Sequence, residues 1–373
     1  MNVKISLGVD RLAEYRSLFE GKKVGLITNV TGVNQQFEET AILLAQIADL
    51  QVIFAPEHGV RGDGQAGENI VTYFDEYYEK NIISLYGNKR APSQADIQDL
   101  DLIVYDIQDI GSRYYTYIYT MFLTLKVCQR NHKQFVVLDR PDIFGGNQVM
   151  GTIMPAEFYS FVGMLPLPNV YGMTVGELAL FCNQELGIQA ELKVIELKGW
   201  RRGMSYNETG LPWISPSPNI PTLQTAWFYV GTCLFEGTNL SEGRGTSHPF
   251  ELIGAPWLNG TTLAVQLNQL KLPGVYFRPS FFTPTFSKYQ GELCEGIQIH
   301  LTDSSVFNPL KVAYKCFELI QQLYPEQLKT DLPFEDSAYT FFTHLMGHKA
   351  EKPVDLSQTL TEFEEARTKY LLY

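Results

Sequence analysis

Cysteine is scarce in this chain, with five among 373 residues: Cys128, Cys182, Cys233, Cys294 and Cys316. The number is odd and no two of them have the spacing CxxC, so the sequence shows neither a disulfide framework nor a zinc-binding motif. We therefore predict that the five cysteines are buried free thiols.

Positively charged residues are also fewer than negatively charged ones. The chain has 29 Lys and Arg residues against 41 Asp and Glu residues, a formal net charge of −12 and a pI near 5.0. A chain of this charge repels polyphosphates unless a local basic stripe compensates, and the sequence contains no such stripe. We predict no nucleic-acid partner.

Long apolar runs are missing as well. No segment approaches the roughly 20 residues that a transmembrane helix needs. The first ten residues also lack the apolar stretch of a secretory signal peptide. These absences predict a protein without a transmembrane segment that is cytoplasmic as the chain stands, or periplasmic or secreted if a leader has been removed.

Several catalytic motifs do not occur: GxxxxGK[ST], HExxH and GxSxG. The six histidines are scattered, so we predict no metal and no cofactor. Residues 62–67 match GxGxxG, but these glycines follow the preceding predicted strand at a distance, and Asp63 would repel a pyrophosphate. What remains is chemistry by carboxylates, tyrosines and arginines.

The apolar residues that are present, 45% of the chain, form short β-branched runs that alternate with helical stretches. This alternation predicts an α/β fold with a Rossmann-like, doubly wound and mostly parallel sheet. The predicted strands are Lys23–Thr28, Leu50–Ala55, Ile82–Tyr86, Leu102–Ile107, Phe135–Leu138 and Leu192–Leu197. The predicted helices are Phe37–Ala48, Tyr114–Arg130 and Thr174–Leu186, the last with a capping box from Thr174 to Glu177.

Loops rich in proline, glycine and polar residues begin near Trp200, and we place a domain boundary there. We expect a catalytic domain at 1–225 and a smaller auxiliary α+β domain at 226–373. The second domain should contain a strand at Gly296–Leu301 and a helix at Leu310–Leu323. Loops of this composition are often functional.

Polar residues follow four of the predicted strands. They are Asn29, the pair Glu57 and His58, the run from Asp106 to Asp109, and the pair Asp139 and Arg140. Ligands bind at the carboxyl ends of strands in open α/β sheets. The coincidence of polar residues at these strand ends predicts a site at that edge.

Glu57 is the sharpest candidate, because it follows Pro56 at the border between a dry core and an open edge, where burial favours a protonated carboxyl group. The alternative is a loop carboxylate paired with Arg61. His58 is a candidate base or ligand, or else a hydrogen-bonded structural residue. Arg61, Arg113 and Arg244 could each clamp an anionic group or form a salt bridge.

Asp106 and Asp109 could supply a second carboxylate, although one of them could instead cap the helix predicted to begin near Tyr114. Tyr114 and Tyr115, at the start of this helix, are better placed to reach a cleft. Tyr117 and Tyr119 fit a buried, sheet-facing position.

Six motifs are distributed over the chain: VGLITN at 24–29, PEHGVRG at 56–62, YDIQDIGSRYYTY at 105–117, LDRP at 138–141, PSPNIP at 216–221 and FEGTNLSEGRG at 235–245. Together they resemble the exo-β-N-acetylmuramidase family, NamZ-type glycoside hydrolases long classified as a domain of unknown function. The resemblance covers nearly the whole chain.

The resemblance implies a Rossmann-like domain, an auxiliary domain, a cleft between them, and release of terminal non-reducing N-acetylmuramic acid from peptidoglycan-derived muropeptides or disaccharides. It also implies that Glu57 is the catalytic glutamate. The second catalytic role stays open between Asp106, Asp109, Glu242 and the 2-acetamido group of the substrate. We further expect substrate contacts from one or more of Asn29, His58, Arg61, Arg113, Tyr114, Tyr115, Asn219, Asn239 and Arg244. The lactyl carboxylate of muramic acid requires a local cation, which Arg61, Arg113 or Arg244 could provide.

Two other functions fit the same residues. A transferase that uses a nucleotide or a sugar nucleotide would bind a nucleotide at the sheet edge. A non-catalytic peptidoglycan-binding module would bind muropeptides and leave them intact. The sequence predicts neither an oligomeric state nor the length of the natural substrate.

Overall fold

The structure is a computed structural model that describes residues 5–65, 67, 71–87, 89–349 and 360–373. The chain forms two compact units. Unit 1 consists of Met1–Val149, Tyr171–Pro221 and Thr359–Tyr373, and unit 2 of Met150–Val170 and Thr222–Gln358. The long N-terminal part of the chain therefore ends, and most of unit 2 begins, between residues 221 and 222. Two shorter segments depart from this division: Met150–Val170 belongs to unit 2 and Thr359–Tyr373 belongs to unit 1. The domain boundary predicted from the sequence, between residues 225 and 226, did not include these two shorter segments.

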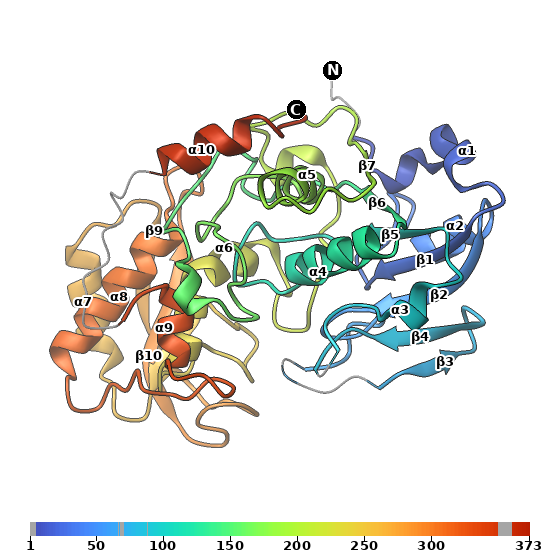
Figure 1. Cartoon of the computed structure of the whole chain (residues 1–373). Helices are drawn as coiled ribbons and strands as arrows, with labels where there is room; N and C mark the ends of the chain where they lie inside the picture. Colours follow the sequence, from blue (N-terminus) through green and yellow to red (C-terminus); the bar gives the residue numbers. More distant parts are fainter. Residues whose placement is uncertain (1–4, 66, 68–70, 88, 350–359) are drawn as a thin grey trace. The chain divides into compact units, whose positions relative to one another are not determined.

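Unit 1 contains a seven-stranded sheet in the order β3-β4-β2-β1-β5-β6-β7, in which only the edge strand β3 is antiparallel (Figure 1). The six parallel strands have the classic Rossmann order 3-2-1-4-5-6 in their sequence numbering. The predicted doubly wound α/β fold is therefore confirmed. The strands are β1 (Lys23–Thr28), β2 (Asp49–Ala55), β3 (Tyr73–Asp75), β4 (Lys80–Ser84), β5 (Leu102–Asp106), β6 (Gln134–Leu138) and β7 (Leu192–Ile195).

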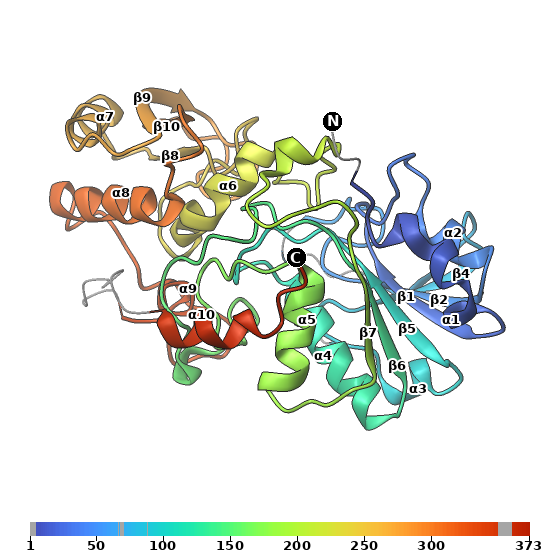
Figure 2. The same ribbon diagram turned by 90° about the horizontal axis from the view of Figure 1, so that it is seen from above.

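Burial explains why these segments form a parallel sheet. Every residue of β5 is buried, as are all residues of β1 after Lys23, and central parallel strands covered on both faces have this continuous apolar character. Helices α4 (Tyr117–Arg130) and α5 (Val175–Glu185) cover one face, and α1 (Arg16–Phe19) and α2 (Thr40–Ala45) lie on the other (Figure 2). The predicted capping box of α5 is confirmed, since Thr174 accepts a hydrogen bond from the Glu177 amide.

The helix boundaries differ from the sequence prediction. Helix α4 begins at Tyr117 and not at Tyr114, and no side chain caps it, so the prediction that Asp106 or Asp109 caps this helix is wrong. The predicted helix Phe37–Ala48 shortens to α2, because residues 29–39 form a turn-rich connection after β1 in which Asn34 Oδ1 accepts hydrogen bonds from the Gln36 and Glu38 amides. Strand β3, three residues long, was not predicted.

Unit 2 contains an antiparallel sheet in the order β8-β10-β9. Its strands are β8 (Leu252–Ala255), β9 (Val275–Phe282) and β10 (Cys294–Leu301), and its helices include α6 (Leu223–Thr232), α7 (Gly260–Gln269), α8 (Pro309–Leu323) and α9 (Phe341–Met346). The predicted strand Gly296–Leu301 and helix Leu310–Leu323 lie within β10 and α8. An α+β unit in this part of the chain is confirmed.

Shorter helices complete unit 1: α3 (Gln94–Ile97), α10 (Thr361–Thr368) and the 3₁₀ segments at Val9–Tyr15 and Tyr206–Thr209. In the part of the chain that is described, none of the helices has the length and apolar character to cross a membrane. All five cysteines are buried and unbonded, as predicted.

Candidate active site

Glu57 lies in a tight turn directly after β2. The Gly59 amide donates to the Pro56 carbonyl over 3.0 Å, which closes the turn. His58 and Gly59 both have positive φ, +69° and +80°. A non-glycine residue in this left-handed region is uncommon and stores backbone strain, which concentrates at functional sites. The turn leaves Glu57 half-buried at the sheet edge.

Hydroxyl groups hold the Glu57 carboxylate. Thr116 Oγ1 donates to Oε2 over 2.7 Å, and the Gly67 amide donates to Oε1 over 3.4 Å. Tyr86 also forms a hydrogen bond with Glu57, and burial together with this carboxylate raises the pKa of Tyr86. Arg61 instead forms an ion pair with Asp75. The alternative pairing with Arg61 is therefore not observed.

Two buried tyrosines join the start of α4 to the loop around residue 216. Tyr117 donates to the Pro216 carbonyl over 2.6 Å, and Tyr115 donates to Ser217 Oγ over 2.9 Å. Burial raises the pKa of both phenols, and the charge of Glu57 raises each of them further. Tyr117 is buried, as expected. Tyr115, which was expected to be better placed to reach a cleft, is only 6% exposed.

The same loop carries two of the predicted asparagine contacts. Asn29 Nδ2 donates to the Pro216 carbonyl over 3.2 Å, and its Oδ1 accepts from the Thr31 amide over 2.9 Å. Asn219 Nδ2 donates to Gln65 Oε1 over 3.2 Å. Asn29 and Asn219 thus connect the loop to the ends of β1 and β2. These contacts place Asn29, Tyr115 and Asn219 in one hydrogen-bonded region with the Glu57 turn.

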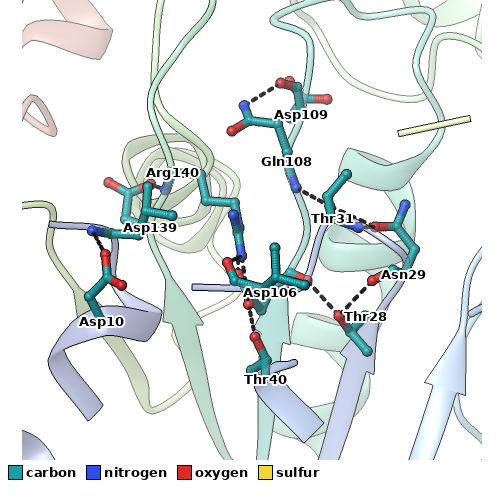
Figure 3. A network of polar contacts seen from close by, with 12 residues as sticks. Asp10, Thr28, Asn29, Thr31, Thr40, Asp106, Gln108, Asp109, Asp139 and Arg140 are labelled. Atoms are coloured by element: carbon teal, nitrogen blue, oxygen red, sulfur yellow. Dashed lines mark hydrogen bonds and ion pairs between the residues drawn. The ribbon is translucent and has the colours of Figure 1, made fainter. Parts of the chain in front are cut away.

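Asp106 is fully buried at the end of β5 and forms an ion pair with Arg140 (Figure 3). Arg140 Nε donates to Oδ1 over 2.6 Å and Nη2 to Oδ2 over 2.9 Å, while Thr40 Oγ1 also binds Oδ2. Both carboxylate oxygens are therefore occupied by protein donors. Breaking such a buried pair is costly, so this geometry fits a structural role.

Asp109 is also buried, with 6% of its surface exposed. It accepts hydrogen bonds from Tyr171 and from the Gly111 amide, and burial raises its pKa to about 6 in spite of these donors. The charges of Asp109 and of Glu57 both raise the pKa of Tyr115, which places this tyrosine near both carboxylates. Asp109 is therefore a buried carboxyl group with a raised pKa that accepts hydrogen bonds from protein donors.

The remaining predicted residues of unit 1 are bound to other groups. Arg61 Nη2 contacts both oxygens of Asp75, at 3.0 and 2.8 Å. His58 Nδ1 lies 2.7 Å from the Gly64 carbonyl oxygen. Arg113 is fully buried, with its Cζ 5.5 Å from the ring centroid of Tyr114, which is itself 2% exposed.

Three predicted residues lie in unit 2. Arg244 donates to Glu236 over 2.6 Å through Nη2, and its Nε lies 3.5 Å from Glu242 Oε1. Lys288 forms an ion pair of 3.0 Å with the other oxygen of Glu242. Asn239 Oδ1 accepts from the Lys329 amide over 2.8 Å. These contacts hold the loop at 236–245 in shape.

Sequence reasoning missed Tyr86 and Thr116, the two hydroxyl partners of Glu57. Tyr86 stands just after β4, so the same rule on strand ends could have identified it. Thr116 gave no local signal, because its contact with Glu57 spans 59 residues of sequence. Among the described residues, no group of three or more His, Cys, Asp or Glu side chains is placed to hold a metal ion.

Taken together, the fold and the site define a Rossmann-like α/β protein with a half-buried carboxylate at a strand end, held by hydroxyl groups. The chain belongs to the exo-β-N-acetylmuramidase NamZ family: the N-terminal family model matches residues 24–224 and the C-terminal model residues 227–373. The predicted family, and with it the class of glycoside hydrolase, is confirmed.

Individual relatives agree with this assignment. The chain is 43% identical to a protein of Bacillus subtilis strain 168 named peptidoglycan β-N-acetylmuramidase NamZ, over 99% of this chain and 92% of the relative. A DUF1343 family protein of Bacteroides fragilis NCTC 9343 is similar in structure, with a TM-score of 0.88, 34% identity and full coverage of both chains. A second DUF1343 protein of that organism has a TM-score of 0.73 and 27% identity over 99% of each chain.

Proposed function

We propose that this protein is an exo-acting β-N-acetylmuramidase that removes terminal N-acetylmuramic acid from the non-reducing end of peptidoglycan fragments. The name of the Bacillus subtilis relative and the description of the family models support this proposal. The observation that carries it is the placement of Glu57: half-buried, at a strand end, in a strained turn, and bound by hydroxyls.

Glu57 is the proposed general acid. Glycoside hydrolysis requires a protonated carboxyl group that donates to the leaving oxygen as the bond to the anomeric carbon breaks. Hydroxyl partners suit this task, because they fix the direction of the carboxyl group and can accept or donate as its protonation changes.

For the second role we propose the 2-acetamido group of the substrate. Asp106, Asp109 and Glu242 are each less than 7% exposed, and each accepts hydrogen bonds from protein groups or pairs with a cation. The acetamido oxygen lies beside the anomeric carbon within the sugar itself and needs no exposed protein carboxylate. A substrate with a trifluoroacetamido group, a weaker nucleophile, should then be hydrolysed at least about 10-fold more slowly.

The central experiment replaces Glu57 by Gln and measures hydrolysis of a chromogenic β-N-acetylmuraminide. We expect wild-type turnover and a loss of about 10²-fold or more in kcat for Glu57→Gln. The matched control is Glu20→Gln, an exposed glutamate of the same unit, which should keep wild-type activity. Thermal unfolding checks that both variants fold. Activity of Glu57→Gln within a few-fold of wild type would remove Glu57 from the acid role.

The exo mode and the alternatives need separate assays. Muropeptides with a terminal N-acetylmuramic acid should release that sugar alone, whereas internal cleavage products would contradict an exo enzyme. Binding without any hydrolysis would favour the non-catalytic module. Saturable nucleotide binding in calorimetry would favour the transferase. The cleft between two domains that the family resemblance implies, and the cellular compartment, stay predictions.

A further inference from the structure

A cavity of about 160 Å³ opens beside the end of β1, next to the segment that follows the Glu57 turn. One water needs about 10–15 Å³ of such space, so this cavity has room for several waters or for a small organic molecule. Its lining includes Asn29, Val33, Glu39, Ala41, Val60 and Arg61. None of the contacts that hold the Glu57 carboxylate involves Glu39 or Ala41.

Glu39 supplies a negative group to this cavity. Its Oε2 atom is buried and has no hydrogen-bond partner among the described residues. Burial, and next the charge of the Glu39 carboxylate, raises the pKa of Tyr78, so this phenol lies close to Glu39. A buried carboxylate oxygen without a partner is unfavourable, and such atoms mark places where a ligand or water is bound.

Arg61 supplies a positive group to the same cavity. Its Nη2 binds Asp75, and its guanidinium lies over the rings of Tyr77 and Tyr78, at 5.3 and 4.8 Å from their centroids. These contacts fix the guanidinium plane. Arg61 and Glu39 both line the cavity, yet no ion pair joins these two residues.

Tyr78 lies beside both charged groups. Its ring centroid is 4.8 Å from the Arg61 guanidinium, and the charge of Glu39 raises the pKa of its phenol. A ligand that carries one positive and one negative group matches these two charges. The remaining walls include Val30, Val33, Ala41 and Val60, which offer apolar contact to a short side chain.

We propose that this cavity binds a free α-amino acid with a small apolar side chain, such as alanine. The ammonium group would donate to the Glu39 carboxylate, and the carboxylate of the ligand would accept from the Arg61 guanidinium, which gives a charge-assisted contact at each end. Binding of an amino acid here does not depend on the proposed hydrolysis, although Asn29 and Arg61, which line the cavity, are also among the expected substrate contacts.

Isothermal titration calorimetry of the full chain with L-alanine, D-alanine and glycine tests the proposal. We expect saturable binding of at least one of these amino acids. Propionate and ethylammonium, which each carry one of the two charges, should bind at least tenfold more weakly. No saturable binding of any of the three amino acids would overturn the proposal and leave a cavity filled with water only. Equal binding of a single-charge analogue would overturn the two-charge recognition.

Variants separate specific binding from a folding defect. Glu39→Gln should weaken binding at least tenfold, and Val33→Phe should do the same by filling the cavity without changing a charge. Glu76→Gln, at an exposed glutamate outside the lining, is the matched control and should bind as wild type. Each variant must keep the wild-type thermal midpoint. Unchanged binding in a folded Glu39→Gln protein would refute the site, whatever the muramidase assay shows.

Discussion

Thr116 Oγ1 donates a hydrogen bond of 2.7 Å to Glu57 Oε2 and so ties the residue before α4 to the turn after β2. The contact joins two of the strand-end segments that the sequence marked as polar. It fixes one oxygen of the proposed acid, and the proton of that acid must point at the leaving group in the transition state.

Thr116→Val should lower kcat about 10-fold with little change in KM, because valine keeps the shape of threonine but cannot donate to Glu57. Steady-state kinetics on the chromogenic substrate measure the effect. Thr116→Ser, which retains a hydroxyl, is the matched control and should recover most of the activity. Equal losses in both variants would point to packing of the methyl group and not to the hydrogen bond.

Tyr86→Phe should lower kcat about 3- to 10-fold and shift the pH–rate profile, because the phenol is a second hydrogen-bond partner of the Glu57 carboxylate. The pH dependence of kcat is the informative measurement, since a purely structural loss would lower the rate equally at every pH. Tyr276→Phe, at an exposed tyrosine of β9, is the control. A profile that keeps its shape would assign Tyr86 to packing alone.

Asp106→Asn should destabilise the fold by about 3–5 kcal/mol, because it leaves the buried Arg140 guanidinium without its counter-charge. Urea unfolding gives the free energy. Thr40→Val removes only the hydroxyl contact to Asp106 and should cost about 1 kcal/mol. The folded fraction of the Asp106 variant should keep kcat within a few-fold; a stable variant that loses about 10²-fold in kcat would return Asp106 to the catalytic candidates.

The free energy of unfolding of Asp142→Asn should fall less than that of the wild type as the pH rises from 4 to 7. Burial, and next among the raising effects the charge of Asp109, brings the pKa of Asp142 from 3.8 to about 7. A pKa that is higher in the folded state means that the folded protein binds the proton more tightly. The stability that Asp142 contributes is therefore present below pH 4 and is lost as the pH rises through about 7.

Denaturant unfolding at pH 5 and at pH 7 measures this effect. Since one pKa unit corresponds to about 1.4 kcal/mol, we expect Asp142→Asn to reduce the difference between the two pH values by about 1–3 kcal/mol. The amide can still accept at the position of Oδ2, which binds the amides of Phe144 and Gly146. Asp99→Asn, at an exposed aspartate, should leave the difference unchanged. An unaltered difference in Asp142→Asn would show that another group titrates.

EDTA should leave the hydrolysis rate unchanged, because a carboxyl acid assisted by the substrate's acetamido group needs no metal ion. The assay compares wild-type protein before and after dialysis against the chelator. A loss of rate that Zn²⁺ or Mg²⁺ restores would contradict this mechanism.

The sequence by itself determined the sheet and the location of the proposed acid. Strand β1 was predicted at its observed limits, Lys23–Thr28, because a short, mainly apolar run bounded by polar residues is a local signal. The position of Glu57 just after β2 follows from the same pattern. Parallel strands bring their carboxyl ends to one edge, so the sequence also indicated that Asn29 and Glu57 lie at that edge.

Only the tertiary structure decided which polar groups are paired with which. Asp106 was a candidate for the second carboxylate, but Arg140, 34 residues away, binds both of its oxygens. Arg61 was a candidate partner of Glu57 and instead binds Asp75. Secondary structure follows from periodicity over a few residues, whereas the partner of a side chain is chosen from every segment that folding brings within about 3 Å. The contact of Thr116 with Glu57, across 59 residues of sequence, was therefore beyond the reach of sequence reasoning.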